Sequence, residues 1–174
     1  MSEAQTSHPM RTVRLEKVTV NIGVGEAGER LVKAEGVLSK LAGQKPVRTK
    51  ARDIQREWGI RRGQDIGVKV TLRGEGAVSF LKRAFYVRNN RLPAYSFDAT
   101  GNLSFGVVDH TDFPDMKYDP ETGIFGMDIA VTFSRPGARV RRRRVVPVSV
   151  GPHHRVARAE AQQFIRDTFS VEVA

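Results

Sequence analysis

The spacing of apolar residues along the chain predicts strands in four places. Residues 65–74, DIGVKVTLRG, alternate strictly, so that Ile66, Val68, Val70 and Leu72 share one face. Glycine or proline marks where the other three stretches begin or end. The predicted strands are RLEKVTVNIGVG at residues 14–25, KPVRTKA at 45–51, DIGVKVTLRG at 65–74 and GIFGMDIAVTFSRPG at 123–137.

Three further stretches repeat apolar residues at helical spacing. In ERLVKAEGVLSKLAG, residues 29–43, Gly43 is a stop signal. The apolar positions of this helix are Leu31, Val32, Val37, Leu38 and Leu41. In GEGAVSFLKRAFYVR, residues 74–88, they are Val78, Leu81 and Phe85. The third helix, RAEAQQFIRDTF at residues 158–169, offers Phe164, Ile165 and Phe169 for docking on the core.

The segment YSFDATGNLSFGVVD, residues 95–109, carries Thr100-Gly101-Asn102 between two alternating arms and predicts a hairpin. Single strands followed by helices, with paired strands later, predict an α+β fold: one twisted, mostly antiparallel sheet with helices on one face. The other face is then free to bind a partner. We expect one domain over residues 1–174, with a core at 11–150, an extended loop at 51–64 and a C-terminal helical tail at 151–174.

The loop at 51–64 contains the only tryptophan, Trp58, and four arginines, and has neither a helical stripe nor strand alternation. If it runs out and back, its tip reaches roughly 20 Å from the sheet. Two interpretations remain open at this point. The loop is either an exposed contact that a partner orders, or it folds back on its own sheet with Trp58 in the core.

Composition favours a nucleic-acid partner. The net charge is +10, and the basic residues are 21 arginines against 8 lysines. The planar arginine fork suits phosphate oxygens and guanine edges better than a lysine does. A thermophilic or salt-adapted surface is the alternative, but such surfaces mix the two signs.

The amino-acid sequence also excludes several classes of protein. Without cysteine there is no disulfide, zinc–thiolate site or cysteine nucleophile. The N-terminus MSEAQTSHPM does not resemble a signal peptide, and no apolar run is long enough to span a bilayer. We therefore expect a cytoplasmic protein without contact to a membrane.

Charge is distributed unevenly along the chain. Residues 92–134 contain seven acidic residues against Lys117 alone. Most lie in DHTDFPDMKYDPETG, residues 109–123, which lacks the spacing of a calcium loop. A Mg²⁺ or acid–base cluster is one interpretation of this segment, and solvated charge is the preferred one. The four histidines have no metal-ligand spacing either, so we expect no metal, no cofactor and no catalytic residues.

GVGEAG, residues 23–28, matches the G-x-G-x-x-G of dinucleotide-binding proteins, after a predicted strand and before a predicted helix. The acidic residue expected some twenty positions later is absent, because that region reads KPVRTK. A nicotinamide oxidoreductase is therefore disfavoured. A glycine turn that meets an RNA phosphate, or a plain turn, fits better.

RPGARVRRRRV, residues 135–145, holds six arginines in ten residues. So many like charges repel one another unless a partner supplies counter-charge. Contact with phosphate is the prediction, and a solvated edge is the alternative.

Five blocks in one order are similar to the large-subunit ribosomal protein L-five family, which binds 5S RNA in the central protuberance. They are KVTVNIGVGEAG, LAGQKPVRTKA, GIRRGQDIGVKVTLRG, SFDATGNLSFGV and KYDPETGIFGMDI. The resemblance runs from about Val18 to Arg144, and SRPGARVRRRRV resembles the archaeal and eukaryotic branch. It implies binding to 5S rRNA and large-subunit rRNA, proximity to neighbouring proteins of the central protuberance, contact with peptidyl-site tRNA, and a bridge to a basic small-subunit protein.

The resemblance and the residue pattern together assign candidate sites. The rRNA-binding candidates are Asn21, Gly23, Gly25, Gln44, Lys45, Pro46, Thr49, Arg135, Arg139, Arg141, Arg142, Arg143 and Arg144. The tRNA-contact candidates are Arg52, Arg56, Trp58, Arg61 and Arg62. The candidates for the bridge between subunits are Asp112, Asp115, Asp119 and Glu121. A free RNA-binding assembly factor or RNA chaperone is the alternative function.

Overall fold

The computed structural model describes residues 8–174. Residues 1–7, which belong to the predicted single domain and to the segment read for a signal peptide, lie outside the described residues. The strands are β1 (Arg14–Gly23), β2 (Val47–Lys50), β3 (Asp65–Leu72), β4 (Arg91–Leu92), β5 (Leu103–Val107), β6 (Met127–Ser134) and β7 (Glu172–Val173). The α-helices are α1 (Glu29–Ala42), α2 (Gly74–Val87) and α3 (Arg158–Phe169).

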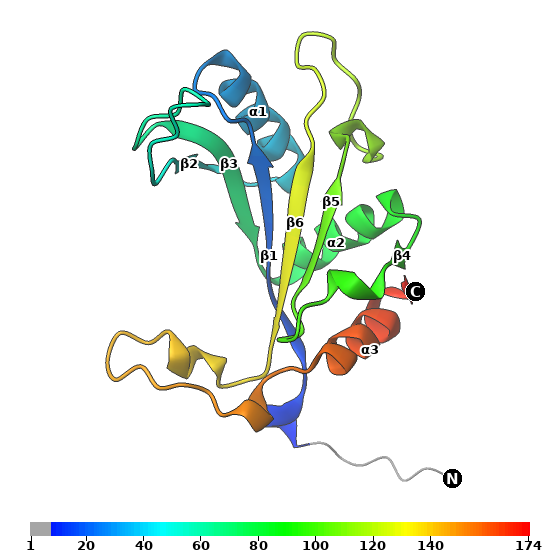
Figure 1. The fold of residues 1–174 in the computed structure, drawn as a ribbon. Helices are drawn as coiled ribbons and strands as arrows, with labels where there is room; N and C mark the ends of the chain where they lie inside the picture. Colours follow the sequence, from blue (N-terminus) through cyan, green and yellow to red (C-terminus); the bar gives the residue numbers. More distant parts are fainter. Residues whose placement is uncertain (1–7) are drawn as a thin grey trace.

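Five strands form one twisted sheet in the order β2-β3-β1-β6-β5, and every neighbouring pair is antiparallel (Figure 1). Val20 of β1 lies opposite Val70 of β3 and Ile129 of β6. Because side chains alternate across a strand, this register gathers the apolar residues on one face. The predicted α+β class with a mostly antiparallel sheet is confirmed.

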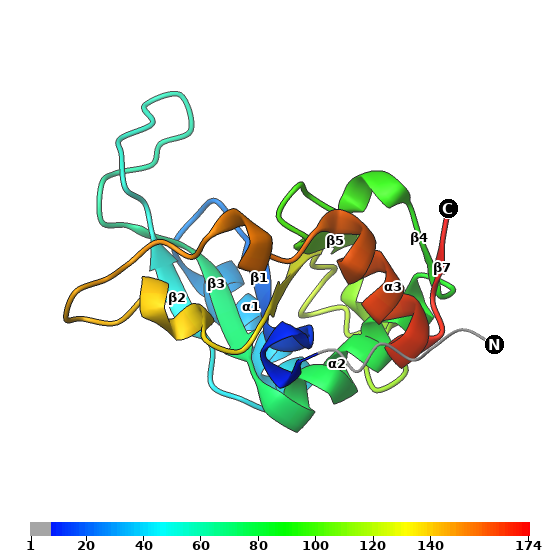
Figure 2. The same ribbon diagram turned by 90° about the horizontal axis from the view of Figure 1, so that it is seen from below.

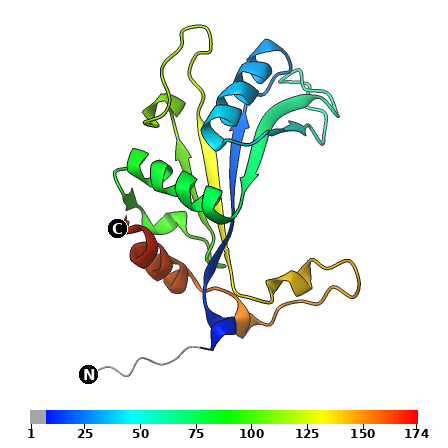
Figure 3. The same ribbon diagram turned by 180° about the vertical axis from the view of Figure 1, so that it is seen from behind.

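Helices α1 and α2 cover the apolar face, as the view from behind shows (Figure 3). Leu31, Leu38 and Leu41 of α1 are buried in the same core as Phe80 and Phe85 of α2. Val32 was predicted on the apolar face of α1, but its side chain is 55% exposed. It lies one position beyond Leu31 and therefore points past the edge of the buried stripe, which Ala34 completes instead.

The opposite face of the sheet is polar, and within residues 8–174 no α-helix covers it. We call it the open face. Lys69, Asn21, Asp128 and Gly106 form one row across β3, β1, β6 and β5. Thr71, Thr19, Ala130 and Ser104 form the next row. The alternation in these strands thus leaves a broad surface that is available to a partner.

Helix α3 docks on the core, as its apolar residues predict. Phe164 makes an edge-to-face contact with Phe133 at a centroid distance of 5.5 Å, and Phe169 makes another with Phe85 at 5.3 Å. After α3, strand β7 pairs in parallel with β4, Arg91 opposite Glu172. This two-stranded pair is an addition to the single predicted sheet.

The predicted hairpin at residues 95–109 is wrong in its first arm. Residues Ala94–Ser96 form a 3-10 helix, and only Phe97 makes an isolated bridge, to Leu103. The physical reason is the turn that follows. The Asp98 carboxylate accepts hydrogen bonds from the backbone N–H groups of Thr100 and Asn102, at 2.9 and 2.7 Å, so residues 98–102 close as a local turn and the first arm pairs with β5 only at Phe97.

Three segments project from the sheet (Figures 1 and 2). Loop 51–64 joins β2 to β3 and leaves the body on the side away from α2. The acidic loop, residues 108–126, joins β5 to β6. The arginine loop, residues 135–151, follows β6 at the opposite end of the sheet. These segments and the open face contain most of the candidate site residues.

Candidate nucleic-acid interface

Asn21 lies in the middle of the open face. It faces Lys69 of β3 on one side and Asp128 of β6 on the other. Its side chain is half-buried. An amide in this position offers both a donor and acceptors to a base or sugar, while Lys69 next to it offers a positive charge.

Two residues after Asn21 the sheet has a glycine strip, where two neighbouring strands both carry glycine. Gly23 of β1 pairs with Gly67 of β3, which in turn pairs with Thr49 of β2. A Cβ atom on Gly67 would lie 2.8 Å from the Ile22 carbonyl oxygen and 2.9 Å from Thr49 Oγ1. Gly67 is therefore covered by its own protein, whereas Gly23 is exposed with open space where a Cβ atom would lie, so a ligand can approach the backbone of β1 at Gly23.

Gln44, Lys45 and Pro46 form the connection from α1 to β2. Gly43 ends α1 in the left-handed conformation, at φ 65°, and so turns the chain towards the sheet. Gln44 and Lys45 are exposed, whereas Pro46 is buried. The first two can therefore touch a partner, while Pro46 holds the connection against the body of the protein.

The G-x-G-x-x-G segment forms a turn between β1 and α1. Gly25 and Gly28 both have positive φ, at 82° and 134°. The N–H groups of Val24 and Gly25 donate to the carbonyl of Ile66, at 3.0 and 2.8 Å. These two donors are thus used within the protein, and Gly25 acts as a turn residue beside the glycine strip.

Loop 51–64 is a narrow hairpin rather than an unstructured connection. At its base Ala51 N–H donates to Gln64 O at 2.8 Å, and Gly63 N–H donates to Ala51 O at 2.9 Å. Nearer the tip Gln55 and Ile60 exchange two backbone hydrogen bonds of 3.0 Å. Ala51 at the base and Ile60 nearer the tip are both buried, so the loop is anchored at two levels.

Trp58 occupies the turn at the tip of this hairpin, with Gly59 at φ 66° beside it. Its side chain is 73% exposed, so the alternative of a core tryptophan is wrong. The arginines of the loop are exposed as well; they are Arg52, Arg56, Arg61 and Arg62. An exposed aromatic ring among arginines is suited to stacking on a base next to phosphate.

The arginine loop separates the six arginines of residues 135–144 into two groups. Arg135 is 9% exposed; it donates to Glu160 Oε1 at 2.5 Å and to His153 O at 3.1 Å. Arg142 donates to the carboxylate of Glu16. Both are neutralised within the protein, so their candidate role at phosphate has to compete with an existing partner.

The other four arginines have no carboxylate within ion-pair distance in the part of the chain that the structure describes. They are Arg139, Arg141, Arg143 and Arg144, and all are exposed. The 3-10 helix Ala138–Arg141 presents the first two, and Arg143 Nε donates to Val146 O at 2.7 Å, which closes the turn. Positive charge without a counter-charge makes this the strongest anion-binding part of the loop.

The acidic loop has an ordered base and an exposed end. His110 is buried; its backbone N–H donates to Phe125 O at 3.2 Å, and its Nδ1 accepts from Phe125 N–H at 3.3 Å. Asp115 forms an ion pair with Arg83 of α2 at 2.6 Å. Hydrogen bonds from the Thr122 hydroxyl and the Glu121 N–H lower the pKa of Asp119. The loop therefore presents Asp112, Asp119 and Glu121 at its surface, whereas Asp115 is tied to its own protein.

Two basic residues, Lys69 and Arg155, lie on these surfaces in the fold although their sequence pattern predicts no role for them. Lys69 alternates with buried valines in β3, and that pattern signals only an outward residue. Arg155 follows the arginine loop and lines the same pocket as Thr132 of the open face. Its position depends on the path of the chain after residue 150, which no local pattern indicates.

Within residues 8–174, no helix has the length and apolar character needed to cross a membrane. The same residues contain no cluster of three or more His, Cys, Asp or Glu side chains that could hold a metal ion.

Comparison with known proteins gives consistent matches over almost the whole chain. Residues 8–61 match the family described as "Ribosomal protein L5", and residues 65–164 match the separate description of the C-terminus of that same ribosomal family. The chain is 53% identical to "Large ribosomal subunit protein uL5" of Sulfurisphaera tokodaii over 174 residues, 99% of this chain and 98% of that protein.

Other relatives carry the same name. The protein of Sulfolobus acidocaldarius is 50% identical, over 99% of this chain and 97% of its own length. That of Methanococcus aeolicus is 47% identical, over 98% and 96%. Two family matches that cover most of the chain, and full-length relatives near 50% identity, leave one conclusion: the chain belongs to the ribosomal protein L5 family.

Proposed function

We propose that this protein binds 5S rRNA through the open face and attaches it to large-subunit rRNA in the central protuberance. Membership of the ribosomal protein L5 family makes the role a structural one in the ribosome, without catalysis. The finer assignment of RNA, tRNA and protein partners is the proposal. It differs from the alternative, a free assembly factor, in one respect: the protein stays bound to the large subunit.

The observation that carries the proposal is the glycine strip beside Asn21. Gly23 leaves the backbone of β1 bare two residues after Asn21, Lys69 of β3 pairs with Asn21, and Gln44 and Lys45 are exposed on the connection to β2. A sugar–phosphate backbone can lie against such a strip while the amides contact bases or riboses and the lysines contact phosphates. A helix-covered face would have no room for such a ligand.

Filter binding to 5S rRNA tests this site. We expect Asn21→Ala and Gln44→Ala each to weaken binding by about 1–3 kcal/mol, because each removes a direct polar contact. Ser79→Ala, on the exposed side of α2, is the matched control and should bind as the wild type does. Unchanged affinity in both amide variants would exclude the open face as the 5S site.

The arginine loop then binds large-subunit rRNA. Its four unneutralised arginines support contact with phosphate groups, which act mainly through charge and carry little sequence information. Residence in the subunit is measured separately, by sedimentation after a high-salt wash. A protein that leaves the large subunit under that treatment behaves as an assembly factor and not as a constituent.

Loop 51–64 contacts peptidyl-site tRNA, and the acidic loop contacts a basic small-subunit protein. The exposed Trp58 and four arginines support the first assignment, since they combine stacking with phosphate binding. Asp112, Asp119 and Glu121 support the second, since an acidic surface repels RNA and attracts a basic protein.

A further inference from the structure

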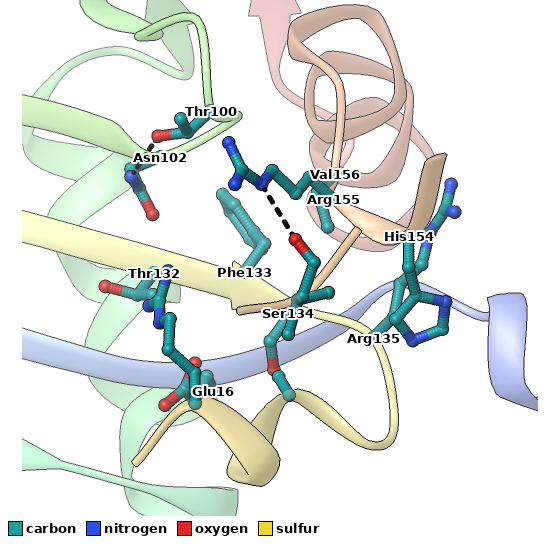
Figure 4. Close-up of a pocket in the computed structure, with 13 residues that line it drawn as sticks. Glu16, Thr100, Asn102, Thr132, Phe133, Ser134, Arg135, His154, Arg155 and Val156 are labelled. Atoms are coloured by element: carbon teal, nitrogen blue, oxygen red, sulfur yellow. Dashed lines mark hydrogen bonds between the residues drawn. The ribbon is translucent and has the colours of Figure 1, made fainter. Parts of the chain in front are cut away.

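A pocket lies on the open face at the end of the sheet opposite to Gly23 (Figure 4). Its volume is about 220 Å³. The end of β6, the turn at residues 98–102 and the segment after the arginine loop form its walls. It is therefore built from parts of the chain that are far apart in sequence, and it is separate from the glycine strip proposed for 5S rRNA.

The charge around the pocket is positive. Arg135, Arg141 and Arg155 line it against a single carboxylate, Glu16. Glu16 is already hydrogen-bonded to Arg142, and Arg135 is already paired with Glu160. Arg141 and Arg155 thus remain for a ligand. A polyanion can pair with both arginines, whereas one acidic side chain of a protein neighbour would pair with only one of them.

Arg155 crosses the pocket in a fixed direction. Its Nε donates to the Val150 carbonyl at 3.3 Å, and Figure 4 shows the side chain extending towards Thr100. One edge of the guanidinium is thereby anchored to the protein. The remaining N–H groups keep their planar fork geometry, which suits phosphate or the acceptor edge of a base.

The polar wall is fixed by Asp98. The Asn102 amide nitrogen donates to Asp98 Oδ2 and to Thr100 Oγ1, both at 2.8 Å. These two bonds define the orientation of the amide, and its oxygen points away from Thr100 towards Thr132 (Figure 4). A fixed acceptor and the Thr132 hydroxyl consequently both line the pocket.

Apolar groups complete the lining. Phe133 and Val156, both largely buried, lie at the base of the pocket next to these polar groups. A phosphate group alone would leave this apolar surface and much of the volume unused. A flat heterocycle with polar edges uses both, which is how proteins recognise bases that have left a helical stack.

We propose that this pocket receives the base of one unpaired RNA nucleotide, with the adjoining phosphates on Arg141 and Arg155. The inference rests on the proposed function, because it assumes an RNA partner, and it adds a second, base-selective site at the other end of the sheet. Binding at this site discriminates between bases. Binding by the arginine loop alone does not.

Competition between four RNA hexamers tests the proposal. The hexamers are uridine oligomers that differ only in one central base, A, C, G or U. We expect the wild-type protein to prefer one of them by about fivefold or more, since a good contact to a base edge discriminates by at least that factor. Thr132→Phe fills the pocket from the open face, where an aromatic residue is favourable in a strand. The Thr132→Phe variant should bind all four hexamers with about the same affinity.

Arg144→Gln is the matched control, because Arg144 lies outside the pocket and carries the same charge as Arg155. It should weaken all four hexamers equally and leave their ratio intact, whereas Arg155→Gln should weaken the preferred hexamer most. Circular dichroism confirms that each variant is folded. A side-chain amide signal of Asn102 that shifts only with the preferred hexamer gives an independent readout.

Two outcomes would overturn the inference. One is equal affinity of the wild type for all four hexamers, and the other is an unchanged ratio in Thr132→Phe. If Thr132→Phe keeps the ratio but prevents incorporation into the large subunit, the pocket receives a protein side chain instead. Loss of 5S binding in Asn21→Ala is measured separately, so failure here leaves the proposed function standing.

Discussion

Glu16 on β1 accepts a hydrogen bond from the guanidinium of Arg142, a residue 126 positions later in the chain. The contact depends on a β-bulge, because the register of β1 against β6 shifts between Leu15 and Lys17 and leaves Glu16 as the extra residue. A bulge re-aims the side chain that it carries. The arginine loop is in this way attached to the sheet at one point, and the charge of one of its arginines is cancelled there.

The salt dependence of RNA binding should separate Arg142 from its neighbours. Replacing Arg144 by Gln removes an unneutralised charge, so the slope of log affinity against log salt should flatten by about one unit for one lost phosphate contact. Arg142→Gln should flatten the slope less, because Glu16 already neutralises that arginine. Glu16→Gln should steepen it. Identical slopes in all four proteins would mean that the loop faces solvent or protein.

Trp58 should be accessible in the free protein and protected by tRNA. Since the chain has no cysteine, Trp58→Cys introduces one thiol at the tip of loop 51–64. Its modification by a maleimide, measured by the mass of this chain, should be rapid in the free protein and slow on ribosomes that carry peptidyl-site tRNA. Ser79→Cys on α2 is the control and should react equally in both states. Equal reactivity of position 58 with and without tRNA counts against the tRNA contact.

The hairpin of loop 51–64 also changes how a deletion should be made. Ala51, Gly63 and Gln64 form the hydrogen-bonded base, so residues 53–62 should be removed and replaced by two glycines. We expect 5S binding to persist, because the open face is untouched. Occupancy of the peptidyl site should fall modestly, since the other ribosomal contacts to the tRNA remain. A loss of 5S binding would place the loop in the rRNA interface.

Reversal of charge in the acidic loop should affect subunit joining and spare 5S binding. Asp112, Asp119 and Glu121 are exposed, so changing all three to Lys removes attraction for a basic neighbour without disturbing the core. Asp115 is left unchanged because it pairs with Arg83. The control carries Glu26→Lys, Glu75→Lys and Asp167→Lys, which give the same net charge elsewhere. If both triple variants join subunits equally well, the acidic loop has no role in the bridge.

Asp98 should stabilise the protein in a pH-dependent manner. Partial burial raises the pKa of its carboxyl, but hydrogen bonds from Asn102 and Thr100 outweigh burial, and the pKa lies below its ordinary value of 3.8. A lowered pKa in the folded state means that the stabilisation is fully present above pH 3.8 and is lost as the pH falls through the lower value. Asp98→Ala should therefore reduce the free energy of unfolding by about 1 kcal/mol near pH 7, a value discounted for solvent exposure.

Chemical denaturation at several pH values checks this prediction. The difference between wild type and Asp98→Ala should shrink as the solution becomes more acidic. A difference that is constant down to about pH 2 would mean that the charged form of Asp98 contributes nothing. The same variant should lose base discrimination at the pocket, because Asn102 is no longer held in place.

The elements that the sequence predicts well are those whose signals are local. The bounds of α3, residues 158–169, agree with the predicted helix, and the four predicted strands contain β1, β2, β3 and β6. Apolar spacing and flanking turn residues suffice for these. The pair β4–β7 carries no such signal, because each strand has only two residues and Arg91 pairs with Glu172 far along the chain.

The candidate site shows the same division. The exposure of Trp58 follows from its charged neighbours, whereas the pairing of Arg135 with Glu160 and of Arg142 with Glu16 depends on contacts between distant segments. A run of arginines looks uniform in sequence. In the fold, two of its six members balance carboxylates of the protein itself, and only the remainder are available to phosphate.

The hydrogen-bonded order β3-β1-β6 has a mechanical consequence. The acidic loop leads into the start of β6, the arginine loop leaves its end, and loop 51–64 leads into β3. A force on the acidic loop would pull or push β6 along its own axis. The backbone hydrogen bonds between β6, β1 and β3 would then pass this force to β3, and many bonds would share it. Because a close-packed core deforms little, the sheet would act as a stiff strut: its projecting segments would move together, and a push at one end would be felt at the others.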